Sequence, residues 1–201
     1  MHVRRDEHGF TLVELLLAIV ILGIISVPLA NMVIGVLHNT DTTSDRLVLS
    51  HDAQISASYF GEDVASAGRH DYSTPGTYSF KPYVELNAAY DNGGIVCGPV
   101  PLAVVRLLVD DWQKTGSTWA VGADVVAYYL NGTELHRAKC SGSAMPSSDI
   151  VVAHNVDPTT VAVTCSSACT AAPDSVTLSF TARLDSQTYP VTLTGQRRQS
   201  S

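Results

Sequence analysis

The clearest pattern in the chain is a long apolar run close to the N-terminus. From Leu15 to Leu37 the sequence reads LLLAIVILGIISVPLANMVIGVL and contains no charged residue. About 20 apolar residues in a helix span the hydrocarbon core of a bilayer. Arg4 and Arg5 precede the run, and Asp41 and Asp45 follow it. Because basic residues favour the cytoplasmic side, the pattern predicts a single-pass segment with the N-terminus inside and the remaining chain outside.

The helical pattern continues beyond the apolar run in an amphipathic form. Leu47, His51, Ile55 and Tyr59 recur every four residues, with Val48 and Val64 flanking them, as expected of a core-facing stripe. Asp45, Arg46, Asp52 and Glu62 are expected on the other faces. Gly68 supplies a stop signal. We therefore predict one helix over residues 10–68, apolar over 10–37 and amphipathic over 38–68.

The rest of the chain, residues 69–201, has the alternating pattern of β-strands. Val176, Leu178, Phe180 and Ala182 alternate with polar residues, which indicates one buried and one solvated face. Asn131-Gly132 is a type I′ hairpin signal. The predicted strands are Thr77–Leu86, Leu102–Val109, Asp124–Leu130, Leu135–Cys140, Ile150–Val156, Thr159–Cys165, Val176–Leu184 and Tyr189–Thr194. The predicted class is α+β, a long N-terminal helix packed on an antiparallel β-sheet head.

Composition and motifs exclude several function classes. The 201 residues are 45% hydrophobic and only 15% charged, which is the opposite of a disordered profile. A net charge of −7 argues against general nucleic-acid binding, which needs a basic surface. No Gly-x-Ser-x-Gly, His-Glu-x-x-His or P-loop motif occurs, so we expect no enzyme, no catalytic residue and no cofactor. Asp110-Asp111 is interpreted as a solvated turn rather than a cation site.

One carboxylate interrupts the start of the apolar segment. The apolar residues begin at Phe10-Thr11-Leu12-Val13, and Glu14 follows before the run resumes. An ionisable group in the apolar interior costs a few kcal/mol unless it is paired, so it indicates a function with a partner. A secretory signal peptide does not explain it, because the run exceeds 7–15 residues and Pro28 lies where the small-residue cleavage site belongs. A plain signal anchor predicts no glutamate there.

The residues His8-Gly9-Phe10-Thr11-Leu12-Val13-Glu14-Leu15 closely resemble the prepilin signal of type IV pilins and of the pseudopilins of type II secretion. The resemblance implies a pilin-like fold and a leader at residues 1–9. It implies that a membrane-bound prepilin peptidase cleaves after Gly9 and methylates the new N-terminus, Phe10. It also implies that Glu14 pairs with the terminal amine of a neighbouring subunit during assembly. Asp6, Glu7 and His8 stand where the family usually has a basic residue, which could slow processing.

A weaker resemblance concerns the head. The stretch Asp124–Arg137, with a strand, a tight turn and a Leu-x-Arg strand, is similar to W-type minor pilins and J-type pseudopilins, and so is the ending Gly195–Arg198. The expected function is a minor pilin that leaves the cytoplasmic membrane for an extracellular or periplasmic filament. Its expected partners are the peptidase and other pilin subunits. The alternatives are a pseudopilin of a type II secretion or DNA-uptake system, and a membrane-anchored extracytoplasmic binding domain.

Four cysteines lie in the region predicted to be outside the membrane: Cys97, Cys140, Cys165 and Cys169. Extracytoplasmic compartments favour disulfides, and four cysteines allow three pairings. The short spacing favours Cys165 with Cys169, which leaves Cys97 with Cys140. A metal site is disfavoured because cysteine pairs at two-residue spacing are missing from the sequence.

Overall fold

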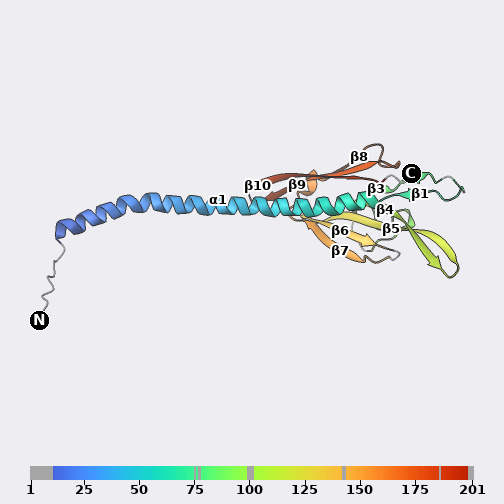
Figure 1. The fold of residues 1–201 in the computed structure, drawn as a ribbon, viewed down its shortest axis with the longest axis horizontal. Helices are drawn as coiled ribbons and strands as arrows, with labels where there is room; N and C mark the ends of the chain where they lie inside the picture. The colour runs from blue at the N-terminus through green and yellow to red at the C-terminus, as the bar shows by residue number, and fades with distance from the viewer. Residues whose placement is uncertain are drawn as a thin grey trace, which may run out of the picture. The chain divides into compact units, whose positions relative to one another are not determined.

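The computed structural model describes residues 11–74, 76, 78–98, 102–141, 144–185 and 187–198. The chain divides into two compact units, residues 1–44 and residues 45–201. Helix α1, Leu12–Ser66, contributes to both units (Figure 1). Its last turn is followed by Gly68, whose φ of +155° lies in a region that side chains disfavour. The helix predicted from the apolar and amphipathic runs therefore forms as one uninterrupted element.

The first unit consists of the N-terminal part of α1. Pro28 lies within the helix and has no backbone N–H to donate to the preceding turn. The hydroxyl of Ser26 donates to the carbonyl of Leu22 at 2.6 Å, and that of Thr40 donates to Val36 at 2.9 Å. Such bonds satisfy polar side chains within the helix itself, which suits a segment in apolar surroundings.

The second unit is the head, and its strands form three antiparallel sheets. The five-stranded sheet has the order β3-β4-β5-β6-β7, the three-stranded sheet has the order β10-β9-β8, and β1 pairs with β2. The bounds are β1 Arg69–His70, β2 Phe80–Lys81, β3 Val84–Ala88, β4 Ala103–Thr115, β5 Thr118–Asn131, β6 Glu134–Cys140, β7 Ser148–Ala153, β8 Ala162–Cys165, β9 Ser175–Leu184 and β10 Gln187–Gln196, with short 3₁₀ helices η1 Asn92–Gly94 and η2 Pro158–Thr160. The expected α+β, pilin-like architecture is present.

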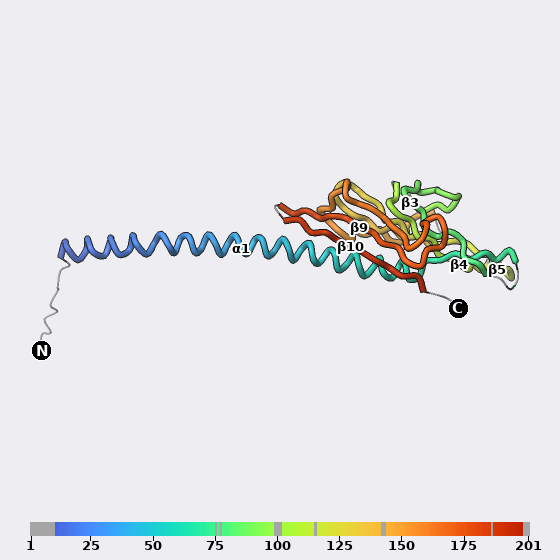
Figure 2. The backbone as a smooth tube through the Cα atoms, turned by 90° about the horizontal axis from the view of Figure 1, so that it is seen from above, coloured from blue at the N-terminus to red at the C-terminus, as the bar shows by residue number. Residues whose placement is uncertain are grey.

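The part of α1 that belongs to the head runs along one side of the sheets (Figure 2), with β8–β10 above it and β6 and β7 below it in the view of Figure 1. Leu49, Phe60 and Val64 are fully buried and join one continuous hydrophobic core. Against the three-stranded sheet the approach is very close, since a Cβ on Gly195 of β10 would lie 2.4 Å from the Cβ of Val64. Glycine at position 195 is therefore what allows the helix to contact the strand backbone.

The stripe predicted to face the core is only partly buried: Val64 lies in the core, but other members of the stripe do not. Leu47 is 66% exposed, and Tyr59 is also exposed. The buried side of this part of α1 is offset from the predicted stripe and includes three polar residues: Asp52, Ser56 and Asp63. Each of the three has a partner in the head, so burial leaves none of these side chains without a hydrogen bond. A pattern based on hydrophobicity alone therefore predicted only part of the buried face.

Several predicted strands differ from the observed ones. The segment predicted as Thr77–Leu86 contains two separate strands, β2 and β3, and Thr77 itself lies outside the described residues. The first part of the predicted strand Thr159–Cys165 is η2, which Asp157 caps by accepting a hydrogen bond from the N–H of Thr159. Asp110-Asp111 is not a turn, because β4 continues through both residues to Thr115. The long β4–β5 hairpin was missed.

The hairpin predicted at Asn131-Gly132 is present, but its turn type differs. Asn131 pairs with Glu134, so the central residues are Gly132 and Thr133. Of these two, only Gly132 has a positive φ, +63°. A type I′ turn needs positive φ at both central positions, whereas type II′ needs it at the first alone, usually glycine. The turn therefore has the type II′ pattern of φ.

Candidate processing and assembly segment

The first turn of α1 is closed by a reciprocal pair of hydrogen bonds. Thr11 precedes the helix, and its hydroxyl oxygen accepts from the backbone N–H of Glu14 at 3.3 Å. The carboxylate of Glu14 accepts from the backbone N–H of Thr11 and from its hydroxyl, both at 3.2 Å. This arrangement is a capping box, in which the N-cap threonine and the glutamate three residues later satisfy each other's free N–H groups.

The capping box was not predicted, although the sequence Thr11-Leu12-Val13-Glu14 has the Thr-x-x-Glu signal of such a box. The helix N-terminus carries partial positive charge, so a carboxylate is favoured at this position. Glu14 therefore stabilises the start of its own helix, which is a second reason for a glutamate in an otherwise apolar segment. The two roles, cap and assembly partner, use the same carboxylate.

The predicted cleavage and methylation residues, Gly9 and Phe10, lie outside the described residues. Thr11, the next residue, has its backbone N–H bound to the Glu14 carboxylate. In a chain that begins at Phe10, this carboxylate thus lies one residue away from the terminal amine. An anion in this position can pair with a cationic amine, either of its own chain or of a docking one.

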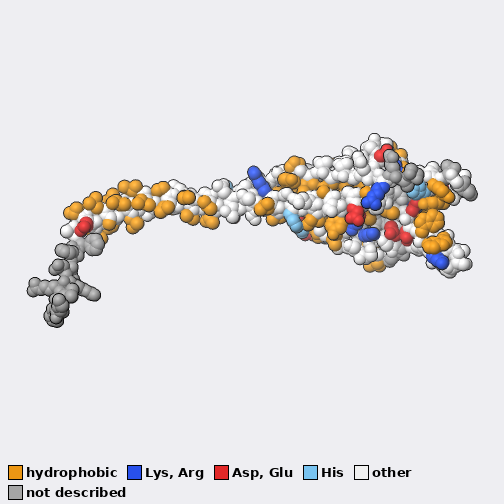
Figure 3. All heavy atoms as spheres, viewed as in Figure 1, with side chains coloured by type: hydrophobic (Ala, Val, Ile, Leu, Met, Phe, Trp, Pro, Cys, Tyr) orange, Lys and Arg blue, Asp and Glu red, His pale blue; other side chains and the backbone are white. Residues whose placement is uncertain are grey.

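The helix surface beyond the cap is apolar and uncovered. The large apolar side chains from Leu12 to Leu37 are between 49% and 76% exposed. They cover the surface of this part of the helix (Figure 3). Helix α1 contains an 18-residue window with a mean hydropathy of 2.7, none of which is buried within the chain. By length and composition, this helix can cross a membrane. Leaving so much apolar surface in water is costly, at about 25 cal/mol per Å², so this face requires lipid or other protein.

Further along, α1 is fixed to the head by charged and polar contacts. Asp52 accepts from the backbone N–H and the ring Nδ1 of His154, at 2.9 Å and 3.0 Å. The hydroxyl of Ser56 donates to the carbonyl of Val152 at 2.7 Å. Asp63 binds Arg137 of β6, and burial raises the pKa of the neighbouring Tyr128, with the Asp63 charge adding to the effect. These contacts join the end of the helix to the five-stranded sheet and to the segment after it.

The four cysteines form two disulfides in the structure. Cys97 is bonded to Cys140, 43 residues away, and Cys165 is bonded to Cys169, four residues away. This is the pairing that the spacing favours. The first bridge ties the loop after β3 to the end of β6 and is completely buried, whereas the second closes a short loop after β8.

No three side chains of the metal-binding types (His, Cys, Asp, Glu) are grouped as a metal site requires, within the part of the chain that the structure describes. Three histidines instead have carboxylate partners: His70 binds Asp110, His136 contacts Asp149, and His154 binds Asp52. Asp110 and Asp52 lie 40 and 102 residues from their histidines, so no local motif indicates these two pairs, whereas His136 also contacts Glu134, two residues away.

Comparison with known proteins adds one finding. Residues 4–30 match the family model described as the prokaryotic N-terminal methylation motif. No curated protein matches the chain. The matched range contains Gly9, Phe10 and Glu14 and extends into the apolar part of α1. The motif implies processing by a prepilin peptidase and assembly with other pilin subunits. The chain therefore carries the prepilin signal of the type IV pilins and pseudopilins.

Proposed function

We propose that this chain is a minor pilin, a structural subunit without enzymatic activity that is processed at its N-terminus and then assembled into a pilus. The observation that carries the proposal is the motif from Gly9 to Glu14 directly before a helix whose apolar surface is uncovered. The prepilin peptidase removes residues 1–9 and methylates Phe10. Residues 10–68 then act as the assembly helix and residues 69–201 as the head.

The apolar half of the helix serves two environments in turn. Before assembly, residues 10–37 hold the subunit in the cytoplasmic membrane, with the N-terminus inside because Arg4 and Arg5 precede the span. After assembly, the same surface packs against the helices of other subunits in the filament core, and the head faces outward. Both environments remove the apolar face from water, which is why one sequence serves both.

Glu14 sets the register between subunits in this proposal. Cleavage creates a cationic amine on Phe10, and in the filament core an unpaired charge is costly whereas a matched pair is favoured. The amine of an arriving subunit therefore seats against the Glu14 carboxylate of a neighbour. Glu14 also disfavours one role, since the tip pseudopilin of the family typically lacks this glutamate.

Support for a minor pilin comes from the head. The stretch Asp124–Arg137, which is similar to both W-type minor pilins and J-type pseudopilins and so favours a minor subunit, lies on the paired strands β5 and β6. Its last residue, Arg137, binds α1 through Asp63. The similar stretch thus includes the residue that attaches the head to the assembly helix.

Processing is tested by mass spectrometry of the mature N-terminus after co-expression with a prepilin peptidase. We expect the wild type to begin at N-methylated Phe10. Gly9→Val should block cleavage, because the peptidase must approach the backbone closely at this point. His8→Ala is the matched control and should leave cleavage intact. A mature protein that retains residues 1–9 would falsify the pilin proposal and would favour the membrane-anchored binding domain.

The assembled system is identified by a deletion in the native host. For a minor pilin, we expect fewer surface pili in the deletion strain and small amounts of the mature chain in pili sheared from the wild type. Normal piliation together with a loss of protein secretion or of DNA uptake would instead show a pseudopilin. Complementation with the Gly9→Val variant should fail in either case, which ties the phenotype to the processed subunit.

A further inference from the structure

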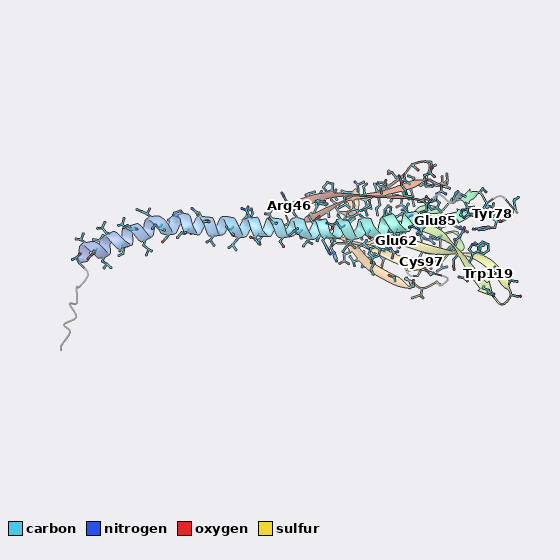
Figure 4. The ribbon with its side chains drawn as sticks, in the orientation of Figure 1. Arg46, Glu62, Tyr78, Glu85, Cys97 and Trp119 are labelled. Atoms are coloured by element: carbon cyan, nitrogen blue, oxygen red, sulfur yellow. A yellow bond between two sulfur atoms is a disulfide. The ribbon has the colours of Figure 1, made fainter. Side chains whose placement is uncertain are left out.

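The β4–β5 hairpin continues beyond the sheet to which it belongs. Strand β3 pairs with β4 only as far as Leu107, and β6 pairs with β5 only from Val125 onward. Between these limits, Asp110–Thr115 and Thr118–Ala123 pair with one another. The projecting ribbon extends from the same end of the head as the loop that carries Tyr78 (Figures 1 and 4).

One face of this ribbon carries exposed aromatic side chains. Trp112 pairs with Val121 and Lys114 pairs with Trp119, so all four side chains lie on the same face. Trp112 is 50% exposed and Trp119 is 61% exposed. The ammonium group of Lys114 lies 5.8 Å from the centre of the Trp119 ring. Tryptophan is seldom left open to water in this way unless the surface has a partner.

Two tyrosines from the loop after β1 extend the same surface. The ring of Tyr72 meets that of Trp112 edge to face, with centres 5.0 Å apart. Tyr78 is 61% exposed, and its ring centre lies 5.5 Å from that of Tyr72. We call Tyr72, Tyr78, Trp112 and Trp119 the aromatic platform. Hydrophobic side chains gather at this end of the head (Figure 3).

A pocket with hydrogen-bonding groups adjoins the platform. It has a volume of about 340 Å³, and its walls include His70, Tyr72, Phe80, Asp110, Trp112 and Arg198. This volume lies within the range of roughly 300–1,000 Å³ that is typical of small-molecule sites. The pocket thus combines aromatic rings with a few polar groups that point toward the same space.

The polar groups of the pocket are already oriented. The Oδ2 atom of Asp110 accepts from the backbone N–H of His70 at 3.0 Å, from the ring Nδ1 of His70 at 2.8 Å and from the hydroxyl of Tyr72 at 2.8 Å. Because a carboxylate only accepts, Nδ1 of His70 must carry the proton. The Tyr72 oxygen retains lone pairs that can accept a hydrogen bond from a further donor, and Nε2 is the second hydrogen-bonding atom of the His70 ring. Burial raises the pKa of Tyr72, so its hydroxyl stays protonated.

We propose that the aromatic platform and this pocket bind a neutral carbohydrate. The weakly polarised C–H groups on one face of a sugar ring pack well on the electron-rich faces of tryptophan and tyrosine. The hydroxyl groups of a sugar need fixed acceptors at the edge of such a stack, and the Tyr72 oxygen and the Asp110 carboxylate supply them. The site lies outside the assembly segment and does not depend on the proposed pilus role.

Charge and polarity favour a neutral sugar over the other occupants. The Asp110 carboxylate repels an anionic ligand, and Arg198 on the pocket wall disfavours a cationic one. The centre of a protein–protein interface is usually depleted of charged residues, whereas this surface has Asp110 beside its aromatic centre. A small ligand with many hydroxyl groups fits both the rings and the polar groups.

The test uses the full chain in a polyoxyethylene detergent, because maltoside headgroups are themselves sugars. The probes are immobilised lactose, N-acetyllactosamine, cellobiose and chitobiose, with sialyllactose as an anionic comparison. We expect saturable binding to at least one neutral probe and a change in tryptophan fluorescence on binding. Trp119→Ala and Trp112→Ala should each weaken binding about tenfold or more, as expected for central aromatic contacts.

Tyr189→Ala is the matched control, since it removes a partly exposed aromatic ring outside the platform and should leave binding unchanged. Because Trp119 is mostly exposed, its replacement should not unfold the head, and the thermal midpoint of each variant checks this. Absence of binding to every neutral probe overturns the proposal. So does binding to sialyllactose alone. Self-association that Trp119→Ala abolishes, without any sugar binding, would identify the platform as a contact between subunits instead.

Discussion

Arg137 of β6 binds Asp63 of α1 through two parallel hydrogen bonds. Nε lies 2.6 Å from Oδ2, and Nη2 lies 2.5 Å from Oδ1. The hydroxyl of Tyr128 donates to the same Oδ2 at 2.5 Å, and all three side chains are buried. The guanidinium also lies 5.0 Å from the centre of the Tyr59 ring. A buried ion pair with two parallel hydrogen bonds thus attaches helix α1 to the five-stranded sheet.

Removing one partner of this pair should destabilise the head strongly. Arg137→Leu leaves the buried Asp63 carboxylate without its countercharge, and we expect a loss of about 3–5 kcal/mol in the free energy of unfolding. Arg183→Leu is the control, because Arg183 pairs with Asp157 at the surface and should cost at most about 1 kcal/mol. Urea unfolding of the two variants measures the difference. Equal losses would show that the buried pair contributes no more than a surface one.

The buried tyrosine beside this pair predicts a dependence on alkaline pH. Burial raises the pKa of Tyr128, and the Asp63 charge raises it further, whereas an unfolded tyrosine ionises near pH 10. Below about pH 10 the Tyr128 hydroxyl is protonated in both the folded and the unfolded chain, so the stability that the buried tyrosine contributes is fully present. Above that pH the Tyr128 hydroxyl loses its proton only in the unfolded chain, and the free energy of unfolding falls by up to about 1.4 kcal/mol per pH unit.

Unfolding curves between about pH 9 and 11 test this, because they bracket the ionisation of unfolded tyrosine. Tyr128→Phe should reduce the slope of stability against pH in this range, since it removes the titrating group and keeps the ring. Tyr189→Phe is the control, because Tyr189 is a more exposed tyrosine near the start of β10, and it should change the slope less than Tyr128→Phe does. A Tyr128→Phe slope equal to that of the wild type would mean that Tyr128 ionises as easily in the folded head as in the unfolded chain.

The capping box allows the two roles of Glu14 to be separated. Glu14→Gln removes the charge but keeps a side chain that can close the box, whereas Thr11→Val removes the cap and keeps the carboxylate. If charge pairing drives assembly, Glu14→Gln should join filaments poorly and Thr11→Val nearly normally. We expect this result, and Glu14→Val should insert into the membrane at least as well as the wild type.

The measurement is the fraction of mature subunit in sheared filaments relative to the membrane, determined for each variant by immunoblot. The reverse order, with Glu14→Gln assembling and Thr11→Val failing, would assign the role of Glu14 to its own helix cap. It would also remove the argument for pairing with the amine of a neighbour.

The two disulfides should contribute unequally to stability. In the loop-entropy description, closing a loop of 43 residues is worth about 4 kcal/mol, and closing one of four residues about 2 kcal/mol. Replacing Cys97 and Cys140 by alanine together should therefore lower the urea midpoint more than replacing Cys165 and Cys169 together. Both bridges should be intact in protein from an oxidising compartment, so a thiol titration of the native chain should find no free thiol. Four titratable thiols would contradict both bridges.

The sequence predicts those features that repeat or that depend on neighbours in the chain. The apolar helix, the alternation in β9 and the glycine turn after β5 are of this kind. The exposure of Leu47 and the burial of Asp63 could not be predicted in this way. The partner of Asp63 is Arg137, 74 residues away, and only the folded sheet brings the two together.

The same reason explains most of what was missed near the proposed sugar site. Asp110 was interpreted as part of a turn because two adjacent aspartates are typical of solvated loops. In the fold, its carboxylate binds Tyr72 and His70, 38 and 40 residues earlier. The capping box at Thr11 is different, because it is local and its Thr-x-x-Glu signal could have been recognised in the sequence.

The way α1 is attached to the head determines how the subunit carries mechanical load. The attachments are staggered along the helix, at Arg46, Asp52, Ser56, Asp63 and Ala65. They connect it to strands of both larger sheets and to the residues that follow β7 and β10. A pull along the helix axis therefore shears these bonds together instead of opening them one after another. Tension that reaches the head through this helix is shared by several bonds at once, and no single bond has to bear it alone.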